Sequence, residues 1–459
     1  MLYRWVRAFL RLCIHVFFRR IEVVGLEHVP SDGAVLFIGN HPNSLLDPAL
    51  ITAFTPRRLS FIAKDTLFKH PILGSLLYRM GAIPIRRKQD HPDGTLDNQS
   101  AFTEVHRTLA LGGAIGIFPE GISHNGTQLA DLKTGAARIA IGVRDQGSSI
   151  AIVPCGLHYI HRRRFRTSVL IQFGPPLLLN PHQDEDDFSK CYIDSLLSPR
   201  HMTKVMELHL RALTVNADDW DALVLLDTVR RLYQPAKIPF EHRVELARRF
   251  NQYYPDVQDQ PEVIELAQEI HQYRDDLYTL GVHDREISQS LSTGFFFSKF
   301  FKLLILGVIW LPLAVIGLWL HLPFVFVVSQ SAPWLSPRKD VLATTKFLAG
   351  FVTLLGLYLG SGGLVYIWGG SFQITLLTPI LLALSGFATL KCAQRGRALW
   401  RLFWVWSRCW SAQESLKELR QRRKRLKTQI KRVVDRYIPL HLDRLFYQNQ
   451  SPDSTEETL

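Results

Sequence analysis

An apolar run that leads into a histidine, with an aspartate six positions later, organises this chain: it reads Val35-Leu36-Phe37-Ile38-Gly39-Asn40-His41-Pro42-Asn43-Ser44-Leu45-Leu46-Asp47-Pro48. An aspartate beside a histidine can fix the imidazole tautomer and stabilise the imidazolium that forms when the ring accepts a proton. Six residues on an ideal helix correspond to about 600° of rotation, so the two side chains would point apart on one helix. We therefore expect His41 in a turn and Asp47 in or near the start of the next helix, with Pro42 and Pro48 favouring the irregular turn. The alternative is a surface loop in which neither side chain has a role.

The composition indicates a basic protein with a large apolar share. The 459 residues include 54 Lys and Arg against 41 Asp and Glu, a net charge of +13, and 47% of them are hydrophobic. Such an excess of positive charge suits nucleic acid, an anionic membrane surface or phosphorylated substrates. Long apolar stretches favour the membrane, and we expect no nucleic-acid partner because no such motif has the required spacing. The five cysteines show neither zinc spacing nor a disulfide framework, which indicates a reducing compartment and predicts no metal site.

Residues 1–20 have the pattern of an amphipathic helix rather than of a signal peptide, because arginines interrupt the apolar run. Arg4, Arg7, Arg11 and His15 recur at steps of three and four residues, and apolar side chains fill the other side. A basic face opposite an apolar face is typical of a helix that lies in a membrane interface. The alternative is a helix docked on the core of its own protein.

Residues 21–196 alternate short apolar runs with helical patterns, which indicates an α/β domain whose sheet is covered on both faces. The expected strands are Ile21–Val24, Val35–Gly39, Leu59–Ala63, Ala82–Arg86, Ala114–Phe118, Ile150–Cys155 and Ser168–Phe173. The expected helices include Asp65–Arg79, Thr95–Leu111 and Thr134–Asp145. His41, the Arg86-Arg87 pair and the Glu120-Gly121 turn each follow an expected strand. Function in such sheets collects at strand ends, so we expect these three sites to converge on one crevice.

The next part of the chain is helical and then strongly apolar. Residues 197–295 predict a helical connector, and residues 296–395 predict membrane helices, since about 20 apolar residues span a bilayer. Basic residues flank and separate the two apolar stretches, which places all three flanks and the catalytic domain on the cytoplasmic side of a multi-pass protein. That requires two hairpins, four segments in all, with Gly369-Gly370-Ser371 as one break. For the first stretch a single tilted span or a re-entrant segment is the alternative, and for both a buried soluble core.

Residues 396–459 are first aromatic and then basic. Trp404, Trp406 and Trp410 precede the dense Lys and Arg run of residues 420–432. Tryptophan at an interface with basic residues beyond it is typical of a juxtamembrane helix on anionic lipid, and the alternative is a solvated basic helix. The tail, residues 450–459, has the composition of a disordered segment.

Four short blocks occur in a fixed order: Asn40-His41 to Asp47, Gly81 to Arg87, Phe118-Pro119-Glu120-Gly121, and Ile152-Val153-Pro154. Arginine suits bidentate phosphate binding, and a carboxylate in a rigid turn can accept hydrogen bonds from hydroxyl groups. With these blocks, the chain resembles the glycerolipid acyltransferase superfamily over residues 20–180. That superfamily includes glycerol-3-phosphate and lysophosphatidate acyltransferases. The resemblance implies a mixed sheet covered by helices, followed here by an all-α portion with membrane helices.

One feature departs from the usual family pattern. Five residues separate His41 from Asp47, one more than is usual. This longer form resembles the subgroup of fungal-type glycerol-3-phosphate and dihydroxyacetone-phosphate acyltransferases, which also carry a later membrane portion. The resemblance therefore favours a glycerol-3-phosphate-type acceptor in phosphatidic acid synthesis, with lysophosphatidate as the alternative.

The mechanism that the resemblance implies has no covalent enzyme intermediate and no cofactor beyond the acyl donor, a thioester of coenzyme A or of acyl carrier protein. His41 would act as general base and Asp47 would orient it. The implied substrate-binding residues are Arg86, Arg87, Glu120, Gly121, Lys64 and Lys133. The arginines would hold the phosphate, Glu120 and Gly121 would position the glycerol, and the lysines would add positive charge at the phosphate. For each lysine the alternative is a solvated amine.

Three other functions are weaker alternatives. A serine hydrolase needs a nucleophile elbow, and the stretch Gly121–Gly126 misses its second glycine by one position. His158 and His161 suggest a metal pair, but no carboxylate or cysteine lies at a supporting spacing. They fit better in a basic surface with Arg162, Arg163, Arg164 and Arg166, which is either a solvated face or a site for anionic lipid headgroups or the acidic carrier of the acyl donor. The third is a non-catalytic, lipid-binding membrane scaffold.

Overall fold

The computed structural model describes residues 1–91, 97–181, 198–235, 238–288, 293–336, 338–411 and 413–437. The chain divides into two compact units. The first comprises residues 1–220, 238–252 and 337–344, and the second comprises residues 221–237, 253–336 and 345–459. The expected connector, residues 197–295, is thus shared between both units.

The first unit is built on a mixed sheet of eight strands, which confirms the expected fold class. The strands are β1 (Arg20–Val24), β2 (Ala34–Gly39), β3 (Leu59–Lys64), β4 (Ile83–Ile85), β5 (Ala114–Ile117), β6 (Ile150–Tyr159), β7 (Ser168–Phe173) and β8 (Leu177–Leu179). Their order is β1-β7-β6-β2-β5-β3-β4, with β8 also paired to β6. Pairing is parallel except where β6 meets β7 and β8. The central strand β2 is buried along its whole length.

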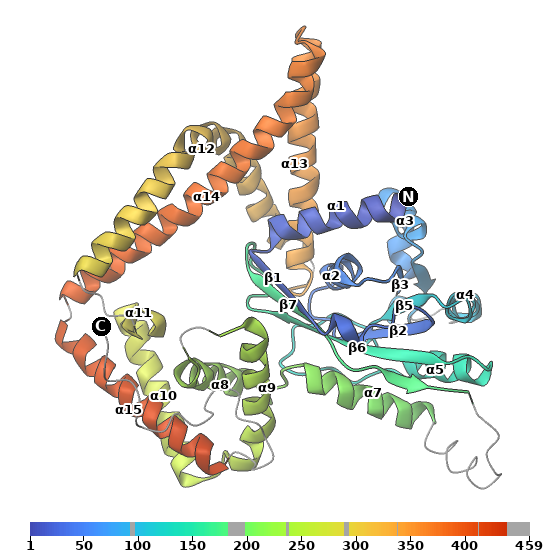
Figure 1. Cartoon of the computed structure of the whole chain (residues 1–459), viewed down its shortest axis with the longest axis horizontal. Helices are drawn as coiled ribbons and strands as arrows, with labels where there is room; N and C mark the ends of the chain where they lie inside the picture. Colours follow the sequence, from blue (N-terminus) through green and yellow to red (C-terminus); the bar gives the residue numbers. More distant parts are fainter. Residues whose placement is uncertain are drawn as a thin grey trace. The chain divides into compact units, whose positions relative to one another are not determined.

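Helices cover both faces of this sheet (Figure 1). On one face Leu36 and Ile38 of β2 pack into the core with α4 (Gln99–Ala110), α5 (Gly135–Asp145) and α7 (Pro199–Leu213). On the other face lie α1 (Leu2–Phe17) and α2 (Leu46–Phe54). Successive side chains of β2 point to opposite faces of the sheet and are buried on both. The strand therefore packs against both layers of helices.

All seven expected strands form, and three differences concern neighbouring segments. The strand expected at Ile150–Cys155 continues to Tyr159, and β8 was missed because it has only three residues. The helix expected over Asp65–Arg79 is broken into the 3-10 helix η2 (Asp65–Lys69) and α3 (Pro71–Arg79). His70 precedes a proline and is extended, with φ −75° and ψ 127°, so it cannot continue a helix.

The helix expected near the N-terminus forms as α1, and its basic side chains contact the same unit. Arg7 and Arg11 both donate hydrogen bonds to the carbonyl of Ala53, and Arg7 also donates to Thr55, at the C-terminal end of α2. Arginine there satisfies carbonyls that have no intrahelical partner. The apolar side chains left exposed on α1 are Leu2, Trp5, Phe9, Leu12 and Val16. The helix thus docks on its own unit through the buried Ile14 and Phe17 and the two arginines, while these five apolar side chains remain exposed.

The remaining elements are helical: η1 (Leu26–His28), α8 (Trp220–Tyr233), α9 (Phe240–Val257), α10 (Pro261–Leu280), α11 (Asp284–Ser288), α12 (Thr293–Leu335), α13 (Leu342–Ile367), α14 (Phe372–Ser411) and α15 (Gln413–Tyr437). In the second unit the basic helix α15 forms ion pairs with acidic residues of α10 and α11. They are Arg422–Asp276, Arg423–Asp284 and Arg436–Glu262. Part of the positive charge of α15 is therefore neutralised within the chain. The tail expected to be disordered, residues 450–459, lies outside the described residues.

Among the described residues, three helices are long and apolar enough to cross a membrane: Phe296–Leu335, Leu342–Ile367 and Phe372–Arg408. The expected break at Gly369-Gly370-Ser371 separates α13 from α14. The expectation of two segments in residues 296–331 stays a prediction: α12 is one helix over Thr293–Leu335, which fits the alternative of a single span. Its ribbon bends in Figure 1, and Pro312 and Pro323 lie inside it. Proline removes a helical hydrogen bond and kinks a helix without necessarily ending it.

Candidate active site

The His41–Asp47 pair forms as the spacing predicts. The strand β2 ends at Gly39, His41 lies in the turn that follows, and Asp47 lies in the first turn of α2. Their side chains meet at 2.8 Å between His41 Nδ1 and Asp47 Oδ2. Ser44 has φ +50°, a conformation that most side chains avoid, and it reverses the chain between the two residues. Asn40 anchors the start of the turn through hydrogen bonds to the backbone of Leu157 in β6.

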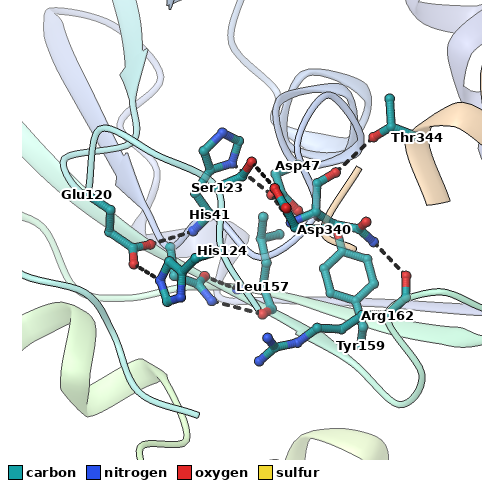
Figure 2. A network of polar contacts seen from close by, with 12 residues as sticks. His41, Asp47, Glu120, Ser123, His124, Leu157, Tyr159, Arg162, Asp340 and Thr344 are labelled. Atoms are coloured by element: carbon teal, nitrogen blue, oxygen red, sulfur yellow. Dashed lines mark hydrogen bonds and ion pairs between the residues drawn. The ribbon is translucent and has the colours of Figure 1, made fainter. Parts of the chain in front are cut away.

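Asp47 is completely buried and accepts three hydrogen bonds (Figure 2). Besides His41, the backbone N–H of Asn43 donates to Oδ2 at 2.7 Å, and the hydroxyl of Tyr159 donates to Oδ1 at 2.5 Å. Burial, followed by the negative charge of Asp47, raises the pKa of Tyr159 well above its usual value, so this hydroxyl keeps its proton. A buried carboxylate with several donors is a fixed acceptor for the imidazole N–H.

The imidazole of His41 is held flat between its partners. It stacks on the ring of Phe118 with centroids 4.1 Å apart and an interplanar angle of 8°, and Phe118 in turn stacks on Phe61. The side chain of His41 is 18% exposed. With Nδ1–H donating to Asp47, the other nitrogen, Nε2, carries the lone pair, and among the described residues it forms no hydrogen bond. That nitrogen is therefore available to accept a proton.

Glu120 holds the backbone of His41. Its side chain is 1% exposed, and it accepts hydrogen bonds from the His41 N–H at 2.7 Å, from the Ala130 N–H at 2.9 Å and from the ring of His124. The next residue, Gly121, has φ +72°, which glycine adopts without strain. The expected contact of Glu120 with glycerol stays a prediction, whereas its contacts with the His41 turn are seen directly.

The expected phosphate-binding residues surround the same turn. Arg87 donates to the carbonyl of Gly121 and to the carboxylate of Asp90, both at 2.6 Å. Burial acts to raise the pKa of Asp90. The hydrogen bond and charge of Arg87, together with the charge of Lys64, outweigh burial, so the pKa of Asp90 lies below its usual value. The side chain of Lys133 lies against Gly121, and its backbone N–H donates to Pro119. The structure thus brings Arg87 and Lys133 to the Glu120-Gly121 turn, and Lys64 acts on Asp90, the partner of Arg87.

Arg86 differs from its neighbour. Its backbone exchanges two hydrogen bonds with the side chain of Asn98, and no described residue pairs with its guanidinium. Arg86 is therefore anchored by its main chain, and its proposed contact with phosphate stays a prediction.

Two residues assigned to a basic surface lie inside the domain instead. His158 forms a hydrogen bond with the carbonyl of Leu213, and burial lowers the pKa of His158 to about 4. Arg162 donates to the carbonyl of Gly126, and its own carbonyl accepts from Asn43. Burial lowers the pKa of Arg162, although the charge of Asp47 acts in the opposite direction. The expectation for His158 was wrong because β6 continues to Tyr159, whereas Arg162 follows β6 and is half-buried.

Tyr159 and Arg162 are the residues beside the pair that the sequence did not reveal. No motif marks them, and only the continuation of β6 and the loop after it bring them to Asp47. Among the described residues, no group of three or more His, Cys, Asp or Glu side chains is arranged to hold a metal ion.

Comparison with known proteins finds similarity in two parts of the chain. Residues 20–158 match the family model "Acyltransferase", and residues 225–442 match the model "Glycerol-3-phosphate acyltransferase 2 C-terminal domain". The glycerol-3-phosphate O-acyltransferase 2 of Saccharomyces cerevisiae is 26% identical, over 61% of this chain and 51% of the relative. The glycerol-3-phosphate O-acyltransferase 1 of the same yeast is 25% identical, over 75% of this chain and 59% of the relative. The chain thus spans between half and three fifths of the length of these relatives.

Two further likenesses cover the first part of the chain. A chloroplastic 1-acyl-sn-glycerol-3-phosphate acyltransferase of Arabidopsis thaliana is 30% identical, over 30% of this chain and 36% of the relative. The crystal structure of the 1-acyl-sn-glycerophosphate acyltransferase of Thermotoga maritima is 20% identical and has a TM-score of 0.30. It covers 44% of this chain and 79% of that one.

Proposed function

We propose that this chain, which belongs to the acyltransferase family over residues 20–158, transfers a fatty acyl group from a thioester to a hydroxyl of glycerol 3-phosphate. The observation that carries the proposal is the oriented His41: Nδ1 is held by Asp47 at 2.8 Å, and Nε2 is left to accept a proton. The two yeast glycerol-3-phosphate O-acyltransferases that align with most of the chain support this acceptor. The donor is a thioester of coenzyme A or of acyl carrier protein.

The reaction follows from the geometry of the pair. His41 Nε2 takes the proton of the acceptor hydroxyl as its oxygen attacks the thioester carbonyl carbon. The new C–O bond forms, the C–S bond then breaks, and the departing thiolate takes the proton from the imidazolium. Asp47 stabilises the imidazolium between these two steps and keeps the ring in one tautomer. The stack on Phe118 prevents the ring from turning away from the acceptor.

Arg87 is the residue best placed to bind the acceptor phosphate. A guanidinium has five N–H donors, and the bonds to Gly121 and Asp90 leave others for a phosphate oxygen. Lys64 and Lys133 add positive charge at the same turn, and Arg86 adds a second guanidinium. Because Arg87 touches Gly121 and Glu120 holds His41, a bound phosphate lies one turn away from the base.

A second candidate function is acylation of 1-acylglycerol 3-phosphate. The 30% identity with the chloroplastic 1-acyl-sn-glycerol-3-phosphate acyltransferase over the first part of the chain favours it. Both acceptors carry the same phosphate, and they differ in the acyl chain that the site must accommodate.

We also propose that the protein works at a membrane, with the catalytic domain on the cytoplasmic face. Three apolar helices and the exposed apolar side chains of α1 support this location. The basic residues of α15 that remain outside its ion pairs, among them Lys424 and Arg425, would meet anionic lipid.

The test is an assay of the purified full chain in detergent with both acceptors and both thioester donors, comparing kcat/KM. We expect the highest value with glycerol 3-phosphate. His41→Ala and Asp47→Ala should abolish transfer while the protein still inserts into membranes. Transfer retained by both variants would overturn the mechanism. Activity with neither acceptor, together with binding to anionic vesicles, would instead support a non-catalytic scaffold.

A further inference from the structure

A short segment that leads from α12 into the first turn of α13 belongs to the catalytic unit, although it is nearly three hundred residues from the His41 turn in sequence. Residues 337–344 are part of the first compact unit, and the described residues of this segment reach two catalytic turns. Figure 2 shows Asp340 beside Ser123 and Thr344 beside the turn that carries Asp47. In each link the residue from this segment, Asp340 or Thr344, is buried.

The first link joins Asp340 to Ser123. The hydroxyl of Ser123 donates to Asp340 Oδ2 at 2.5 Å, and Arg338 donates both to that carboxylate at 2.6 Å and to the Ser123 carbonyl at 3.0 Å. Asp340 is 7% exposed. Burial raises the pKa of Asp340, but the hydrogen bonds from Arg338 and Ser123 outweigh this and lower it, so the carboxylate is charged. Ser123 is three residues after Glu120, which holds the His41 backbone.

The second link joins Thr344 to Asn43. The hydroxyl of Thr344 donates to the Asn43 carbonyl at 3.0 Å, and both residues are buried, at 3% and 2% exposure. The N–H of that same Asn43 donates to Asp47 Oδ2, the oxygen that accepts from His41. Thr344 is thus two hydrogen bonds away from the carboxylate that orients the base.

Both links reach His41 through residues that bind it directly. Through Asn43 and Asp47 one link controls the imidazole, and through the Glu120 turn the other controls the backbone N–H. A buried donor or acceptor that loses its partner is costly, so the two turns are expected to shift together if either link is removed. A misplacement of about 1 Å can reduce an enzymatic rate about a hundred-fold even when the change lies away from the reacting atoms.

We propose that Asp340 and Thr344 are positioning residues that hold the two catalytic turns around His41, so that the segment between two apolar helices completes the acyltransferase site. The effect on turnover rests on the proposed function, whereas the effect on the order of the turns does not. Neither residue touches the reacting atoms in this assignment; each acts through a neighbour.

The experiment compares two substitutions at Thr344 with a matched one in the same helix. Thr344→Val keeps the shape of the side chain and removes the hydroxyl, whereas Thr344→Ser keeps the hydroxyl. Thr353→Val is the control, because among the described residues the Thr353 hydroxyl bonds only to the Ala349 carbonyl of its own helix, α13. Each full-length variant is purified in detergent, and kcat and KM for glycerol 3-phosphate are measured. Hydrogen exchange is followed in peptides covering residues 41–47 and 119–126.

We expect Thr344→Val to lower kcat about ten-fold with little change in KM, since the base is misplaced while the phosphate site is untouched. Exchange in residues 41–47 should become faster. Thr344→Ser should restore most of the rate, and Thr353→Val should match the wild type. Asp340→Ala should lower kcat similarly and speed exchange in residues 119–126.

Three outcomes would overturn the proposal. They are a wild-type kcat in both Thr344→Val and Asp340→Ala, an equal loss in Thr344→Val and Thr353→Val, and unchanged exchange in residues 41–47. If the wild type transfers no acyl group to any acceptor, the proposed function fails. The exchange comparison then still tests the positioning of the two turns.

Discussion

Tyr159 and His41 bind opposite oxygens of the same buried carboxylate: the Tyr159 hydroxyl donates to Asp47 Oδ1 at 2.5 Å, and His41 Nδ1 contacts Oδ2 at 2.8 Å. The tyrosine comes from the far end of β6, and the histidine follows β2, which pairs with β6 in parallel. The orienting aspartate is therefore itself oriented by the neighbouring strand. This relationship makes the catalytic pair dependent on the sheet and not on the turn alone.

Tyr159→Phe is expected to reduce turnover. Without the tyrosine donor, Oδ1 of the buried Asp47 loses a hydrogen-bond partner, so the carboxylate is held less firmly and orients the imidazole of His41 less precisely. Because the base is misplaced while the phosphate site is unchanged, kcat should fall about ten-fold with little change in KM for glycerol 3-phosphate.

Steady-state kinetics of the purified variant measure kcat and KM separately. Tyr278→Phe is the control, because Tyr278 is exposed in the second unit, at 87%. A wild-type kcat in Tyr159→Phe would contradict the assigned role of Tyr159.

Arg87→Ala is expected to weaken binding of the acceptor. A hydrogen bond to a charged group contributes about 1.5–3 kcal/mol, so KM for glycerol 3-phosphate should rise roughly ten- to a hundred-fold. Arg87→Lys should recover little, because an ammonium cannot bind the Gly121 carbonyl and Asp90 with the same planar geometry. The matched control is Arg107→Ala, an exposed arginine paired with Glu104. A KM unchanged in Arg87→Ala would assign the phosphate to other residues.

Glu120→Gln is expected to destabilise the protein as well as slow it. The carboxylate of Glu120 accepts three hydrogen bonds, and both of its oxygens are used. Glutamine replaces one oxygen by an NH2 group, so a donor then faces a donor and one buried group loses its partner. A buried polar group left without a partner costs about 1–3 kcal/mol. Thermal unfolding followed by circular dichroism should show a lower midpoint, and kcat should fall with it.

The exposed pair of Glu104 with Arg107 provides the control for that change. Glu104→Gln should leave both the midpoint and kcat near the wild-type values, since exposed ion pairs contribute about 0–1 kcal/mol. If Glu120→Gln lowers binding of the acceptor and leaves stability intact, Glu120 contacts substrate and its internal bonds are secondary.

His158 is expected to make the folded protein less stable in acid. Burial lowers its folded-state pKa to about 4, whereas the unfolded chain takes up the proton near pH 6.5. Between these values the unfolded state binds more protons, so this contribution is fully present above about pH 6.5 and is lost as pH falls towards 4. The unfolding midpoint of His158→Asn should therefore fall less steeply over that range than the wild-type midpoint. The same substitution at exposed His201 is the control, and parallel slopes for His158→Asn and wild type would contradict the prediction.

Local features of the sequence were sufficient for the strands and for the catalytic pair. Apolar runs such as Val35–Gly39 predict buried strands, because a strand that is covered on both faces carries apolar side chains on both. The six-residue step to Asp47 and its two prolines required a turn before a helix, and the structure forms one. The break before Pro71 was missed, because the residues on both sides of it have a helical pattern. The proline itself is a local signal for such a break, since it keeps the preceding residue out of the helical conformation.

The contacts of Glu120, Tyr159, Asp340 and Thr344 could not be read in the same way. Each joins residues far apart in the chain: Tyr159 lies 112 positions from Asp47, and Thr344 lies 301 positions from Asn43. Periodicity reports only which side of a helix or strand is buried, and it says nothing of which distant polar group a buried one will meet. A hydroxyl or carboxylate buried by packing must find its partner there, and only the folded chain determines which partner that is. The sequence of residues 35–48 thus specifies a base and its orienting carboxylate. The folded chain specifies how firmly they are held.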